Sequence, residues 1–110
     1  MRIILDECLP ARLRHELPGH EVWTVTHEGW SGIKNGKLLR LVADSGRFDV
    51  FLTMDKNLPQ QQQLEGLPFA TVVLRATSNE INAVRPLLPK LLRRLPEFQP
   101  GQVYFLHPTT

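Results

Sequence analysis

The sequence predicts an α/β domain of three layers, in which helices cover both faces of a mostly parallel five-stranded sheet. Short aliphatic or β-branched segments alternate with leucine-rich segments along the chain, which is the pattern of strand–helix–strand units. The chain has 110 residues and is 42% hydrophobic. That size and composition suit one domain with its own core, so we expect a single domain over residues 1–110.

Five segments have the composition of strands. The first, third and fourth are mostly aliphatic or β-branched, which suits central strands that are buried on both faces. The second mixes polar and apolar residues, so we expect it at an edge of the sheet. The segments are 2–5 (RIIL), 20–25 (HEVWTV), 49–53 (DVFLT), 69–74 (FATVVL) and 102–106 (QVYFL).

The first two helices are predicted from their boundaries. Pro10 suits the first turn of a helix, and leucines recur at every fourth residue until Pro18-Gly19 ends the segment. Asn35 is a plausible N-cap for a helix that carries leucines on one face, with Gly46 near its end. A single helical turn is expected after Pro59.

The last helical segment is the longest. Thr77 and Glu80 have the spacing of a capping box, and an apolar stripe of leucine, isoleucine and valine follows them as far as residue 95. Pro86 and Pro89 lie inside the stripe. Because proline interrupts a helix, we expect a kink or two short helices here.

Composition excludes several classes of protein. The apolar runs are far shorter than the roughly 20 residues of a membrane helix, and the N-terminal residues lack a long apolar segment of the signal-peptide type. The single cysteine, Cys8, excludes an internal disulfide and fits a reducing cytoplasm. The net charge of +2 does not by itself indicate a nucleic-acid partner.

Carboxylates follow two of the predicted strands. Asp6 and Glu7 come directly after the first strand, and Asp55 lies two residues past the third. If these strands are neighbours, the acids meet at the carboxyl edge of the sheet, where α/β proteins bind ligands. Close carboxylates repel one another unless a cation compensates, and Mg²⁺ prefers oxygen ligands. The alternatives are structural: Asp6 as a helix cap, Glu7 as an exposed neighbour and Asp55 in an Asx turn.

The segments RIILDECLPARLRHELPGHEV, GWSGIKNGKLL and FDVFLTMDKNL, within roughly residues 1–65, resemble the small bacterial PIN-like proteins related to the PIN-domain nucleases. The resemblance implies a parallel α/β sheet and acids that bind Mg²⁺ or Mn²⁺ for RNA hydrolysis. It also implies RNA as a partner and, for a toxin-like member, a small antitoxin protein. A homodimer in the cytoplasm is a further expectation.

The resemblance also assigns residues. Asp6, Glu7 and Asp55 are the expected catalytic acids, and Asp6 and Asp55 are expected to bind the metal with Asn35. The expected substrate contacts are chosen for their chemistry: Lys34, Lys56 and Arg12 for charge on the RNA backbone and Trp30 for stacking on a base, together with Asn57.

Two positions depart from the family pattern. Asn35 and Asn57 stand where many relatives have an acid, and the loss of two negative charges should weaken metal binding. One rival hypothesis is therefore a catalytically silent module that binds nucleic acid or protein. A second rival is a phosphoacceptor receiver domain, which also has an acidic pair after its first strand. The receiver needs a lysine after the fifth strand, where this chain has His107.

Overall fold

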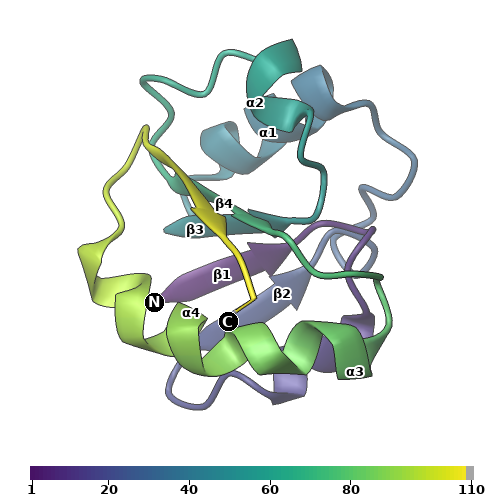
Figure 1. Cartoon of the computed structure of the whole chain (residues 1–110). Coiled ribbons are helices and arrows are strands. Elements are labelled where there is room, and N and C mark those ends of the chain that lie inside the picture. The colour runs from purple at the N-terminus through teal and green to yellow at the C-terminus, as the bar shows by residue number, and fades with distance from the viewer. Residues whose placement is uncertain (109–110) are drawn as a thin grey trace.

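The computed structural model describes residues 1–108 and contains a five-stranded sheet in the order β2-β1-β3-β4-β5 (Figure 1). Each neighbouring pair of strands is parallel. The predicted central position of β1, β3 and β4 and the edge position of β2 are confirmed, and the sheet is parallel throughout. The strands are β1 (Arg2–Leu5), β2 (Glu21–Thr24), β3 (Val50–Thr53), β4 (Ala70–Leu74) and β5 (Val103–Leu106).

Helices cover both faces of this sheet. In Figure 1, α1 and α2 lie above the strands, and α3 and α4 lie below them. None of the helices within residues 1–108 is long and apolar enough to cross a membrane. The α-helices are α1 (Asn35–Ser45), α2 (Leu58–Gln61), α3 (Ile81–Val84) and α4 (Leu88–Arg94), and the 3₁₀ helices are η1 (Ala11–His15), η2 (Arg85–Leu87) and η3 (Leu95–Glu97).

The sheet carries a hydrophobic cluster on each face. Side chains alternate between the two faces along a strand, so Leu5 and Leu52 pack in the cluster with Leu91 of α4. Ile4 and Phe51 pack in the other cluster with leucines and a valine of α1. This division of adjacent residues between two cores confirms the three-layer α/β/α architecture.

Two of the predicted helix starts were wrong in detail. Asn35 is the first residue of α1 rather than its cap, a position that Lys34 occupies. The Asn35 side chain instead donates a hydrogen bond to Asp55. This tertiary contact replaces the expected capping bond to the helix backbone. Glu80 occupies the N-cap position of α3, where the capping box predicted Thr77, and makes no side-chain capping bond. Its backbone N–H donates to Ser78 Oγ at 3.2 Å. The predicted helix after Pro10 is the short 3₁₀ helix η1.

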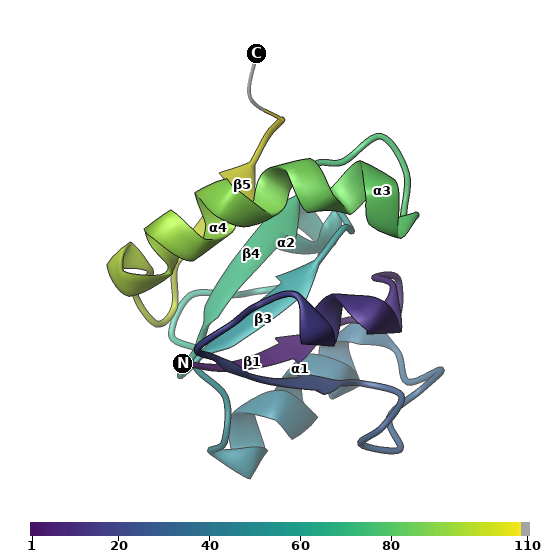
Figure 2. The ribbon, with the colours of Figure 1, turned by 90° about the horizontal axis from the view of Figure 1, so that it is seen from below.

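The proline-rich stripe forms consecutive short helices, as predicted. Pro86, Pro89 and Pro96 each lie at one of the first two positions of η2, α4 and η3, respectively, where the missing N–H is tolerated. Figure 2 shows that α3 and α4 follow one another as one rod across the sheet. The interruptions therefore change the helix type without turning the chain away from the core.

Candidate functional site at the carboxyl edge

A threonine joins the two aspartates at the carboxyl edge of β1 and β3. Asp6 follows β1 and its backbone N–H donates to Leu52 O at 2.9 Å, so the ladder with β3 continues one residue past β1. Thr53 Oγ1 donates to Asp6 Oδ2 at 2.7 Å. The same Oγ1 accepts the backbone N–H of Asp55 at 3.1 Å. We call Asp6, Thr53 and Asp55 the acidic edge.

Asp6 is a buried carboxylate, with 8% of its surface exposed. Burial raises its pKa, while the Thr53 hydroxyl and the Glu7 backbone N–H at 2.9 Å act in the opposite direction. The charged form is therefore held in an unfavourable environment and would gain from a nearby cation. A cation would stabilise an exposed carboxylate much less, because water already solvates its charge.

Glu7 contacts the glycine-rich loop that precedes α1. Its carboxylate accepts a 2.7 Å hydrogen bond from Ser31 Oγ and a 3.1 Å bond from the Gly32 backbone N–H. The Ser31 hydroxyl and then the Gly32 amide lower the pKa of Glu7. Glu7 therefore anchors this loop to the end of β1. Within residues 1–108, no three His, Cys, Asp or Glu side chains form a group that could hold a metal ion.

The Asp55 carboxylate accepts hydrogen bonds from Asn57 and Asn35. Its Oδ1 accepts the backbone N–H of Asn57 at 3.0 Å, which is the geometry of the predicted Asx turn. Its Oδ2 accepts Asn35 Nδ2 from the start of α1 at 3.3 Å. An aspartate at position 35 could not donate this bond when ionised. The neutral amide therefore satisfies Asp55 at a place where an acid would repel it.

The acidic edge has the donor atoms that a hard divalent cation requires. Asp6, Thr53 and Asp55 supply oxygen atoms, and Asn35 has an amide oxygen beside them. Each carboxylate oxygen of the two aspartates accepts one hydrogen bond from the described residues, which leaves lone pairs free on every oxygen. Mg²⁺ commonly uses one or two carboxylates and keeps several waters, so these residues fit such an ion chemically.

The remaining predicted contacts lie in different environments. Lys34, Lys56 and Arg12 are exposed. Trp30 is half-buried and packs against the core cluster under α1. Cys8 Sγ accepts the Met54 backbone N–H at 3.3 Å, and burial raises the pKa of the thiol.

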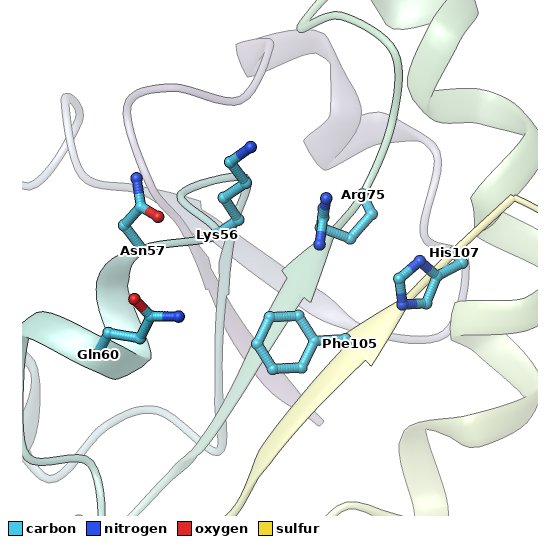
Figure 3. A pocket seen from close by; sticks show the side chains of 6 residues that line it. All are labelled: Lys56, Asn57, Gln60, Arg75, Phe105 and His107. Atoms are coloured by element: carbon cyan, nitrogen blue, oxygen red, sulfur yellow. The ribbon is translucent and has the colours of Figure 1, made fainter.

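A pocket with a basic lining adjoins the acidic edge and includes residues that the sequence analysis did not select. It lies at the carboxyl ends of β3, β4 and β5 and has a volume of about 480 Å³. We call it the basic pocket. Its lining residues are Lys56, Asn57, Gln60, Arg75, Phe105 and His107 (Figure 3).

The residues that were missed had a signal in the sequence. Arg75 follows β4 directly, and His107 follows β5 directly. Asp6 was selected because polar residues just past parallel strands lie at the same edge of the sheet. The same reasoning applies to Arg75 and His107. Phe105 had no such signal, because an aromatic residue inside a strand is usually part of the core.

The chain was also compared with family models, curated proteins and solved structures, and none of them matches it.

Proposed function

We propose that this protein is a metal-dependent ribonuclease of the PIN-like type, with its reaction centre at the acidic edge. The observation that carries the proposal is the link through Thr53, which bonds to the Asp6 carboxylate and to the Asp55 backbone N–H, so that both aspartates lie at one end of neighbouring strands. The burial that raises the pKa of Asp6 adds a reason for a cation to bind there.

Each residue has a distinct part in this proposal. Asp6 and Asp55 would hold the cation. Thr53 orients the Asp6 carboxylate, and Asn35 and the Asn57 backbone N–H orient the Asp55 carboxylate. A divalent cation held there would lower the pKa of a coordinated water and would stabilise charge on the phosphate. Lys56 follows Asp55 directly and is exposed, so its ammonium group can bind the RNA backbone beside the acids. Glu7 keeps the loop before α1 in place through Ser31 and Gly32.

A labelled single-stranded RNA tests the proposal. The protein should cleave it with Mg²⁺ or Mn²⁺ and not with EDTA. Asp6→Asn and Asp55→Asn should each lower the rate by about 100-fold or more, because each removes a charge from the reaction centre. Asp44→Asn is the matched control, since Asp44 is exposed near the opposite end of α1 from Asn35. Equal cleavage by the three variants would indicate a contaminating nuclease and contradict the proposal.

A second candidate is a PIN-like module that binds its partner without chemistry. The contact that favours it is the 3.3 Å bond from Asn35 to Asp55, which satisfies the carboxylate without a metal. Restoring acids with Asn35→Asp and Asn57→Asp separates the two candidates. If the natural protein and both variants leave RNA intact with Mg²⁺ and with Mn²⁺, the silent module replaces the enzyme.

A further inference from the structure

The basic pocket brings together three nitrogen-bearing side chains from three segments. Lys56 follows β3, Arg75 follows β4 and His107 follows β5. In Figure 3 the Arg75 side chain lies between those of Lys56 and His107, and its guanidinium is on the side toward Lys56. The parallel order β3-β4-β5 makes this possible, because all three strands end at the same edge.

Within residues 1–108, the two permanent cations of the pocket, Lys56 and Arg75, form no ion pair with a carboxylate. The ion pairs found within residues 1–108 join Arg2 with Asp49, Arg47 with Glu28, and Arg85 with Glu16. Lys56 and Arg75 therefore keep their charge available to a ligand, unlike those three arginines. A concave site with uncompensated cations attracts an anion, and an arginine beside a lysine suits the oxygens of a phosphate.

Phe105 gives the pocket an apolar wall. Its side chain lies in β5, and the residue has 38% of its surface exposed. Phe105 is one of the two large hydrophobic residues that are exposed within residues 1–108, and the other is the terminal Met1. The ring lines one side of the pocket, and Asn57 and Gln60 line the opposite side (Figure 3). An exposed aromatic ring beside cations is the combination on which a nucleic-acid base stacks.

We propose that the basic pocket binds one nucleotide of a single-stranded RNA, with its phosphate on Lys56 and Arg75 and its base on Phe105. The choice of RNA rests on the proposed function, whereas the pocket itself needs no metal. Its volume of about 480 Å³ falls in the range of small-ligand sites. Lys56 and Asn57 directly follow Asp55, so a nucleotide held here places its strand beside the acidic edge.

Binding of a fluorescent single-stranded RNA hexamer in EDTA tests this inference by anisotropy. Arg75→Gln should weaken binding roughly tenfold. It should also reduce the slope of log affinity against log salt concentration by about 0.7, the value for one phosphate contact on a single strand. Phe105→Leu keeps the apolar bulk and removes the ring, and it should weaken binding about fivefold or more with an unchanged salt slope.

Arg93→Gln is the matched control. Arg93 is exposed on α4 and does not line the basic pocket, so this variant loses the same charge and should bind like the natural protein. If Arg75→Gln or Phe105→Leu binds as tightly as the natural protein, or if Arg93→Gln weakens binding equally, the inference is overturned. An acidic peptide of equal charge that displaces the RNA equally well would also overturn the assignment to a nucleotide.

The result can be separated from that of the cleavage test. Metal-free binding that depends on Arg75 and Phe105 supports the pocket even if the protein never cleaves RNA. Metal-dependent cleavage that is insensitive to both substitutions supports the enzyme and overturns the pocket.

Discussion

The hydroxyl of Thr53 donates a 2.7 Å hydrogen bond to the carboxylate of Asp6, and both side chains are buried. Thr53 is the last residue of β3, and Asp6 follows the last residue of β1. The bond therefore crosses between neighbouring strands at the point where both leave the sheet. Since Thr53 Oγ1 also accepts the Asp55 N–H, this one side chain positions both aspartates.

Thr53→Val should destabilise the protein by about 1–3 kcal/mol, because it leaves the buried Asp6 oxygen and the Asp55 N–H without a partner. Thr71→Val is the matched control. Thr71 lies in β4 and is 1% exposed, and its Oγ1 has no hydrogen-bond partner among the described residues. Removal of that hydroxyl should leave stability unchanged or increase it. Urea denaturation measures both, and equal losses in the two variants would contradict the role given to Thr53.

Asp6→Asn should stabilise the metal-free protein at pH 7 by about 0.5–2 kcal/mol, because it removes a charge that burial disfavours. Burial raises the pKa of Asp6 in the folded state, so the folded state binds the proton more tightly than the unfolded state. The natural protein therefore loses stability as the pH rises above the unfolded value of about 3.9.

Comparison of the natural protein with Asp6→Asn across pH isolates this effect. The advantage of the variant should be small near pH 4 and should grow toward pH 7, as measured by urea denaturation in EDTA. Asp44→Asn removes an exposed carboxylate and should show a much smaller trend. If Asp6→Asn is less stable than the natural protein at pH 7, Asp6 is a purely structural acid.

Asn35→Asp should make the stability of the protein depend on metal. The variant places a second carboxylate at the contact that Asn35 Nδ2 makes with Asp55 Oδ2 at 3.3 Å. Two like charges at this separation repel, and a divalent cation between them reverses the effect. The melting temperature should fall in EDTA and rise with Mn²⁺, by more than in the natural protein.

Asn79→Asp serves as the control for that measurement. Asn79 is exposed in the loop before α3, so the variant adds the same charge without facing Asp55. The change in its melting temperature on addition of Mn²⁺ should match that of the natural protein. A similar Mn²⁺ response in Asn35→Asp and Asn79→Asp would count against a cation site at the acidic edge.

Glu7→Gln should loosen the glycine-rich loop before α1. The bonds from Ser31 and Gly32 lower the pKa of Glu7, so their stabilisation is present above the unfolded value of about 4.3 and is lost as the pH falls through the lower folded value. At pH 7 the neutral amide loses the charge assistance, and hydrogen exchange at the Gly32 N–H should be faster. Glu21→Gln, at an exposed residue of β2, should leave that exchange rate unchanged.

The sequence by itself determined the layers of the fold. Aliphatic segments such as Ile3 to Leu5 and Val50 to Leu52 can be buried only as strands covered on both faces, so their composition predicts both the strands and their central place. The convergence of Asp6 and Asp55 followed from that arrangement, because parallel neighbours end at the same edge. Local composition carries this information, since burial of apolar surface is the dominant driving force of folding.

Only the tertiary structure decided which residues contact one another at the carboxyl edge of the sheet. Glu7 is adjacent to Asp6 in sequence, yet it bonds to Ser31 and Gly32 in a loop 24 and 25 residues away. Arg75 and Phe105 join Lys56 in the basic pocket because β4 lies next to β3 and β5 lies next to β4. Such contacts depend on the order of the strands and on the path of the loops. In the loops, a polar side chain can bond either to nearby backbone or to a residue distant in sequence. Composition predicts which residues reach the edge, and packing then decides which of them meet.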